Sequence, residues 1–309
     1  MNHPQSSSLS IEYFLILSDG CSWWLSGVNE SVRWVDKLAT IMELKESKSN
    51  GSPKLIFSSE VASNGRIHRA SDCVAAKLSY SGPNAGLSIS HPDSFRVWRY
   101  NNTPDVVCEV KDNDESAEIE IINMWFALHP IYQRSMCVSG LPFHAGLIEL
   151  DGRGVLLAAR GDTGKSTCCC RLPDYWKPLC DDEALVVFDK QKKYRAHPFP
   201  TWSDYLWKHS EKTWNVQYSV PLTGVFFLEQ SEVDEIKPLG EGQAAVLMAE
   251  SATQVCRKFW RTSAREDQRA FRIEIFNNAC KMAKQIPAYR LCVSLYGEFW
   301  EKMEQVIGR

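Results

Sequence analysis

Hydrophobic residues in the first part of the chain occur in short runs separated by polar turns. Such runs predict strands, at residues 11–17, 54–57, 95–100 and 106–110. Apolar residues recur with helical spacing from about Ser31 to Leu44, and Asn29 can cap that helix. Residues 45–53 are polar and predict a loop.

The segment from residue 115 to residue 139 combines the two-residue period of a strand with the period of a helix. Ile119 and Ile121 alternate with polar residues as in a strand, and helical spacing follows. Pro130 lies inside this helix and should kink it, and Gly140 should end it. We place a domain boundary just after this helix. It divides the chain into a smaller α+β N-terminal domain, residues 1–138, for partner or peptide recognition, and a second domain, residues 139–309.

Beyond Gly140, predicted strands and helices alternate. The strands are expected at residues 143–150, 155–159, 184–188, 223–228 and 290–294, with a short one near Val233. The helices are expected at residues 242–250, 252–261, 266–283 and 298–306. The Asp151–Gly154 segment predicts a hairpin turn between the first two strands. This order predicts an α/β fold with α+β elements.

One of these strands leads into a motif that binds phosphate. The apolar run that ends at Ala159 precedes Gly164-Lys165-Ser166 and a helical segment, which is the order of a phosphate-binding loop. The predicted nucleotide-binding residues are Arg160, Gly161, Asp162, Thr163, Gly164, Lys165, Ser166 and Thr167. Backbone N–H groups would surround the phosphates, Lys165 would reach the terminal ones, and Ser166 would hold Mg²⁺. The alternative is a chance Gly-Lys-Ser, since Ala159 stands where the strict motif has Gly.

Acidic residues and a histidine flank this loop. His144 lies on the preceding strand, and Asp181 and Asp182 open a later one. One carboxylate can hold Mg²⁺ and the other can take a proton from a hydroxyl, with His144 tuning that base. We assign His144, Asp181 and Asp182 to catalysis and Ser166 and Asp182 to the metal; spacing does not decide which Asp is the base. The alternatives are a core histidine and a solvated acidic turn.

A basic cluster lies further along the chain. Arg257, Arg261 and Arg265 would share one face of an unbroken helix, and one of them could reach the γ-phosphate. The alternative is a solvated face paired with Glu266 and Asp267.

Composition narrows the classes of function. The net charge of −3 gives no drive towards nucleic acid, and no apolar run is long enough to span a membrane. None of the 11 cysteines forms a C-x-x-C pair, and Cys168, Cys169 and Cys170 are expected to pack a helix rather than bind metal. So many free thiols indicate a reducing, cytoplasmic location.

Several of these features together resemble the HPr serine kinase/phosphorylase family. They are His144-Ala145-Gly146, the hairpin, the Gly164-Lys165-Ser166 loop and the Asp181-Asp182 pair, within residues 141–189. The resemblance implies an HPr-kinase-like core that uses ATP and Mg²⁺ and forms a homo-oligomer. Thr167 stands where true HPr kinases usually carry Glu, so the expected acceptor is a hydroxyl of a protein or peptide other than HPr.

Among the relatives of that family, the chain resembles the SynChlorMet cassette family ScmC. Residues 198–203 and 221–228 carry this likeness, with weaker support from residues 18–20 and 37–39. The resemblance implies that radical-SAM enzymes of a peptide-modification cassette are partners.

These observations lead to three alternative functions that can be tested. The first is transfer of the γ-phosphoryl group of ATP to a Ser or Thr hydroxyl of a peptide or protein. The second is a non-catalytic, nucleotide-dependent peptide-binding module. The third is a plain NTPase, which ranks last because no water-positioning residue is evident in the sequence.

Overall fold

The computed structural model describes residues 11–28, 31–47, 53–58, 95–99, 103–110, 117–159, 163–208, 210–260 and 265–308. Asn29, the predicted helix cap, lies outside them, as do Arg160, Gly161 and Asp162 of the predicted phosphate loop.

The first sheet is built from the N-terminal part of the chain. Its strands are β1 (Glu12–Ile16), β2 (Ser22–Val28), β3 (Lys45–Glu46), β4 (Lys54–Ser58), β5 (Phe95–Arg99) and β6 (Val106–Val110), in the order β3-β1-β2-β4-β6-β5. Helix α1 (Ser31–Ile41) packs on β2 and β4 through Trp34, Val35 and Leu38. The predicted strands are confirmed. β2 was not predicted, and the expected loop from residue 45 begins with the short β3.

Two helices connect this sheet to the next one. They are α2 (Ala117–Ala127) and α3 (His129–Met136). The alternating strand expected at Ile119 and Ile121 is wrong, because these residues lie in α2. The kinked helix is also wrong: Pro130 lies in the first turn of α3, where its missing N–H breaks no helical hydrogen bond.

The second sheet contains the remaining strands. They are β7 (Leu141–Leu150), β8 (Arg153–Ala158), β9 (Lys177–Cys180), β10 (Glu183–Phe188), β11 (Tyr194–Phe199), β12 (Val220–Gln230), β13 (Glu235–Pro238) and β14 (Ala288–Val293). The order is β11-β10-β7-β8-β12-β14-β13, with β9 paired to β7. β12 runs parallel to both β8 and β14. β9 and β11 were not predicted.

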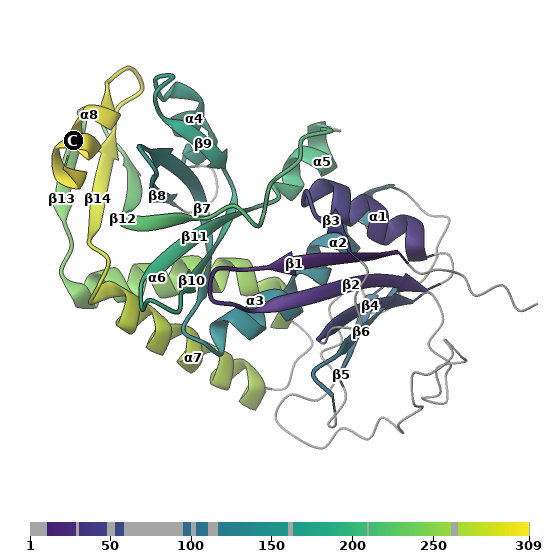
Figure 1. Cartoon of the computed structure of the whole chain (residues 1–309). Coiled ribbons are helices and arrows are strands. Elements are labelled where there is room, and N and C mark those ends of the chain that lie inside the picture. The colour runs from purple at the N-terminus through teal and green to yellow at the C-terminus, as the bar shows by residue number, and fades with distance from the viewer. Residues whose placement is uncertain are drawn as a thin grey trace, which may run out of the picture.

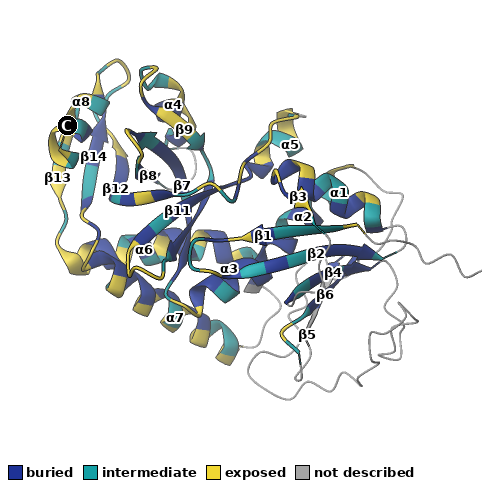
Figure 2. Cartoon of the chain, in the orientation of Figure 1, coloured by how far each residue is buried: buried dark blue, intermediate teal, exposed yellow. Residues whose placement is uncertain are grey.

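Helices cover both faces of the second sheet (Figure 1). On one face lie α4 (Lys165–Arg171) and α8 (Phe299–Ile307), and on the other lie α6 (Glu241–Cys256), which is followed by a 3-10 turn η1 (Arg257–Trp260), and α7 (Arg265–Ala283). Helix α5 (Trp202–Lys208) instead packs on α2. In β8, Val155 and Leu157 belong to the hydrophobic cluster under α4 and α8, whereas Leu156 belongs to the cluster on the α6 and α7 face. This alternation follows from the two-residue period of a strand. Figure 2 shows the buried residues concentrated in the strands.

The break expected between two helices at residues 242–250 and 252–261 is wrong, because α6 is continuous through Ser251.

The fold is a mixed α+β arrangement, as predicted in outline. The boundary near residue 138 stays a prediction; it lies between the two sheets, but one hydrophobic cluster holds Leu25 of the first and Val186 of the second. Within the described ranges, no helix combines the length and apolarity required to cross a bilayer.

Candidate functional site

The site begins with the hairpin of β7 and β8. Asp151 and Gly152 both have positive φ, 50° and 74°, the backbone of a tight two-residue hairpin turn. The register that this turn fixes pairs Ala145 with Ala158, so β8 ends beside the middle of β7, one residue after His144. The chain leaving β8 therefore enters the phosphate loop next to His144.

Helix α4 lies close against β7 because Gly146 has no side chain. A Cβ at Gly146 would lie 2.8 Å from Cys169 Sγ. His144 and Gly146 share one face of β7, and Lys165 and Cys169 are one turn apart on α4. The close approach at Gly146 thus places Lys165 beside His144.

Part of the predicted phosphate loop is described. Gly164 has φ of 103°, a left-handed conformation that favours glycine, directly before α4. Ser166 and Thr167 are exposed, and the carbonyl of Thr163 accepts a 3.4 Å hydrogen bond from Gln230 at the end of β12.

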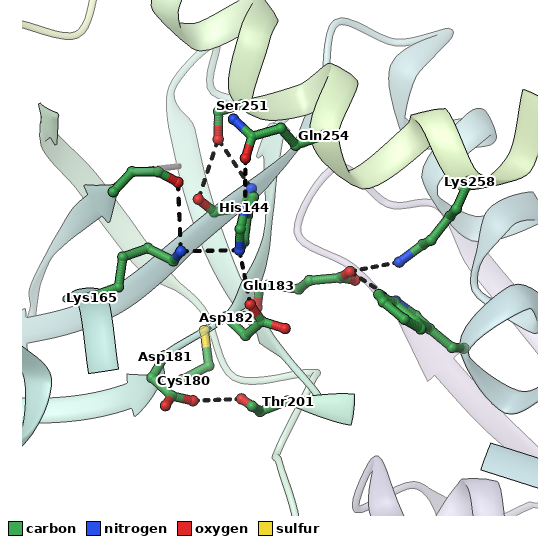
Figure 3. A network of polar contacts seen from close by, with 12 residues as sticks. His144, Lys165, Cys180, Asp181, Asp182, Glu183, Thr201, Ser251, Gln254 and Lys258 are labelled. Carbon is green, nitrogen blue, oxygen red and sulfur yellow. Dashed lines mark hydrogen bonds and ion pairs between the residues drawn. The ribbon is translucent and has the colours of Figure 1, made fainter. Parts of the chain in front are cut away.

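Lys165, His144 and Asp182 converge from α4, β7 and the start of β10 (Figure 3). His144 Nε2 lies 3.0 Å from Lys165 Nζ and also 3.0 Å from Asp182 Oδ1. An ammonium only donates hydrogen bonds and a carboxylate only accepts them. Nε2 therefore accepts from Lys165 when it is unprotonated and donates to Asp182 when it carries a proton.

The other ring nitrogen has its own partner. His144 Nδ1 lies 2.8 Å from Gln254 Oε1 on α6, so Nδ1–H donates to it. In the neutral ring, Nε2 is then the basic nitrogen. The backbone of His144 is also held, because its N–H donates to Ser251 Oγ at 3.1 Å.

The charges of this cluster act on the Asp182 carboxyl. Burial by itself raises the pKa of Asp182, but the hydrogen bond and charge of His144, together with Lys165 and Lys258, outweigh burial. The pKa of Asp182 is thus below its ordinary value of 3.8, and the group is ionised at neutral pH.

The structure separates the two aspartates. Thr201 Oγ1 donates a 2.6 Å hydrogen bond to Asp181 Oδ1, whereas Asp182 contacts His144. Both residues lie in the bend that precedes β10, and their separate partners hold the two carboxylates apart. The two carboxylates are therefore available for different roles.

A second polar cluster, not predicted from the sequence, surrounds Glu183. Its Oε1 accepts from Trp125 Nε1 at 2.8 Å and from Lys258 Nζ at 2.7 Å, and its Oε2 accepts from Tyr132 at 2.9 Å. Lys258 Nζ also lies 3.1 Å from the centre of the Trp125 ring. Burial lowers the pKa of Lys258 and the charge of Glu183 opposes that effect. In the sequence Glu183 follows the predicted Asp pair and Lys258 follows Arg257 of the basic cluster, but only the fold pairs them.

The two clusters border one pocket of about 230 Å³. It is lined by Trp125, His144, Asp182, Glu183, Gln254, Val255, Arg257 and Lys258. Lys165 lies across His144 from the Glu183–Lys258 pair (Figure 3). The pocket therefore lies on one side of the His144–Asp182 pair and Lys165 lies on the other.

The basic cluster does not form the single helical face that its spacing predicted. α6 ends at Cys256, η1 follows, and α7 begins at Arg265, while Arg261 lies outside the described residues. Of the three arginines, Arg257 lines the pocket. On α4, Cys168 and Cys169 are buried, as predicted, whereas Cys170 is exposed, so the packing role predicted for it is wrong.

The fold and site define a mixed α+β protein with a polar cluster beside a Gly-Lys-Ser segment. The family model described as SynChlorMet cassette protein ScmC matches residues 106–308, and the chain belongs to this family. The matched region includes the second sheet, its helices and the residues of the site. No curated protein matches the chain.

Proposed function

We propose that the protein is an ATP-dependent kinase with an HPr-kinase-like phosphate-loop core. It transfers the γ-phosphoryl group to a Ser or Thr hydroxyl of a peptide or protein in a peptide-modification pathway. The observation that carries this proposal is the meeting of Lys165, His144 and Asp182, from three separate segments, at contacts of 3.0 Å. The family name supports a partner from the same cassette, a peptide substrate or a radical-SAM enzyme.

The donor set suits a magnesium–nucleotide substrate. Lys165 would neutralise the terminal phosphates. The exposed Ser166 hydroxyl and Asp181 would hold Mg²⁺, with Asp181 in place of the Asp182 expected from the sequence, because Asp182 is engaged by His144. Within the described ranges, no three His, Cys, Asp or Glu side chains gather to hold a metal by themselves. Mg²⁺ needs no such cage, since it is commonly held by one or two protein ligands, water and the phosphates of its substrate. When bound, the ion supplies charge neutralisation.

The geometry supports Asp182 rather than Asp181 as the base. Asp182 contacts His144 and lines the pocket, whereas Asp181 is tied to Thr201. Once Lys165 turns to the phosphates, His144 Nε2 keeps Asp182 as its contact. The acceptor oxygen bonds to the γ-phosphorus as the bond to the β–γ bridging oxygen breaks. The hydroxyl proton passes to the Asp182–His144 pair, and ADP leaves.

Transfer of label from γ-labelled ATP to a cassette-encoded peptide tests this proposal. We expect Asp182→Asn to lower the rate by about 10²–10⁴-fold, the usual contribution of a general base, with nucleotide affinity nearly unchanged. Asp181→Asn is the matched variant; it should instead raise the magnesium concentration needed for half-maximal rate. Wild-type protein that binds magnesium–ATP but labels no co-encoded partner would contradict the kinase proposal.

The non-catalytic peptide-binding module remains the second candidate. The buried contacts between α2, α3 and the pocket favour it, because they connect Trp125 and Tyr132 to the site through Glu183. In that case Asp182→Asn should retain both nucleotide binding and peptide capture, and also the biological role.

A further inference from the structure

The pocket beside His144 and Asp182 has an unequal distribution of charge. Both oxygens of Glu183 are engaged, by Trp125, Lys258 and Tyr132, and its side chain is 4% exposed. Lys258 is therefore committed to Glu183. Asp182 is engaged by His144. These contacts leave no uncompensated carboxylate among the residues that line the pocket.

Arg257, by contrast, carries a charge that no carboxylate of the described residues compensates. It lines the same pocket, its side chain is exposed, and it forms no ion pair with any carboxylate of the described residues. An exposed guanidinium at the mouth of a pocket attracts a carboxylate and can bind it with two parallel hydrogen bonds. The pocket walls at Trp125 and Val255 add apolar surface for the methylene groups of such a side chain.

The position of the pocket identifies its occupant. Lys165 lies on the other side of His144 and is not part of the pocket lining. An in-line phosphoryl transfer requires the acceptor to approach from the side opposite the leaving group. A volume of about 230 Å³ is below the roughly 300–1,000 Å³ of sites that enclose a whole ligand, so it suits one or two side chains of a longer chain.

We infer that this pocket is the acceptor subsite and that Arg257 selects a peptide in which the hydroxyl residue stands beside an acidic residue. This inference rests on the proposed kinase function and specifies its substrate. The hydroxyl reaches Asp182, and the neighbouring carboxylate meets Arg257.

Three synthetic peptides that differ only at the residue after serine, Glu, Gln or Lys, test the inference with the full-length protein. Transfer is measured with magnesium–ATP, and binding is measured by calorimetry with a non-hydrolysable ATP analogue. We expect wild-type protein to have a KM about tenfold lower for the Glu peptide than for the Gln peptide, with similar kcat, as one charge-assisted contact would give.

Variants at Arg257 should change this preference. Arg257→Ala should equalise the Glu and Gln peptides, and Arg257→Glu should favour the Lys peptide. Arg272→Ala is the matched control, because Arg272 is an exposed arginine of α7 outside the pocket. It should keep the wild-type preference.

The remaining outcomes separate the two proposals. Equal transfer to all three peptides by wild-type protein overturns the acceptor inference and leaves the kinase intact. A binding preference that depends on Arg257 without any transfer overturns the kinase and supports the pocket. If Arg257→Ala lowers kcat for every peptide with KM unchanged, Arg257 acts on the phosphoryl group and the inference is wrong.

Discussion

At the scale of the residue, the proton on His144 Nε2 decides which neighbour the ring contacts. Lys165 and Asp182 are both 3.0 Å away and have opposite hydrogen-bonding character. Sequence spacing predicted that His144 would act with these residues. It could not decide between Asp181 and Asp182, because adjacent residues differ only in the side of the chain to which they point.

Replacing His144 should raise the pKa of Asp182. In His144→Phe, burial still favours the neutral carboxyl, while the hydrogen bond and charge of the histidine are lost. NMR titration of ¹³C-labelled aspartate, assigned with Asp182→Asn, measures the change. A lowered pKa stabilises the fold above pH 3.8 and loses this effect as pH falls through the folded pKa, so His144→Phe should also reduce the acid dependence of stability. An unchanged titration would contradict the assigned contact.

Removing Lys258 should destabilise the protein. The Lys258 and Glu183 side chains are 16% and 4% exposed, so Lys258→Met leaves a buried charge without its cation. We expect a loss of about 3 kcal/mol in the free energy of unfolding. Glu183→Gln/Lys258→Met should cost less than the two single variants summed, as urea denaturation would measure in a double-mutant cycle. Additive losses would show that the pair is not coupled.

At the scale of the element, tertiary contacts explain the differences from prediction. The prediction divided this helix at Ser251, a residue type whose hydroxyl can compete for backbone groups. In the fold that hydroxyl instead accepts from the backbone of His144, and α6 continues. β11 contains Pro198, which argues against a strand, yet it pairs with β10 along its length. The strand at residues 155–158, by contrast, could be predicted from its apolar run without knowledge of tertiary contacts.

The contact between α4 and β7 gives a prediction at this scale. Gly146→Ala should force Cys169 or the whole of α4 to move, because the new Cβ would lie 2.8 Å from the buried sulfur. We expect a loss of about 1–3 kcal/mol in stability and weaker nucleotide binding through displacement of Lys165. Thermal unfolding and nucleotide titration measure the two effects.

The matched control for this variant is Gly242→Ala. Gly242 lies in α6, and a Cβ there would meet nothing within 4 Å. Alanine should stabilise that helix by up to about 1 kcal/mol. Wild-type stability and binding in Gly146→Ala would mean that α4 does not depend on the close approach.

At the scale of the whole molecule, a buried histidine connects the two sheets. His197 of β11 donates from Nδ1 to the carbonyl of Val216 at 2.8 Å and accepts at Nε2 from the N–H of Ser18, which follows β1, at 3.1 Å. Burial, with the nearby charge of Arg195, lowers the pKa of His197 to about 4. The ring must therefore stay neutral for both contacts to persist.

This histidine should make stability depend on pH. The unfolded chain binds a proton near pH 6.5 and the folded chain near 4, so stability is complete above 6.5 and falls as pH drops towards 4. The difference corresponds to about 3 kcal/mol. His197→Gln should be less stable at pH 7 but lose less between pH 6.5 and 4 in urea denaturation. Equal slopes for both proteins would contradict this role.

The sequence by itself determined the strands at 155–158 and 223–228, the order strand, Gly-Lys-Ser, helix, and the residues His144, Asp181, Asp182 and Lys165. These are local signals, because hydrophobic periodicity and the residue types that form turns depend on residues close together in the sequence. Only the tertiary structure paired Glu183 with Lys258, turned Asp182 rather than Asp181 towards His144, and placed Arg257 at the pocket. Such contacts join segments far apart in the chain, and their energy comes from burial that no local pattern records.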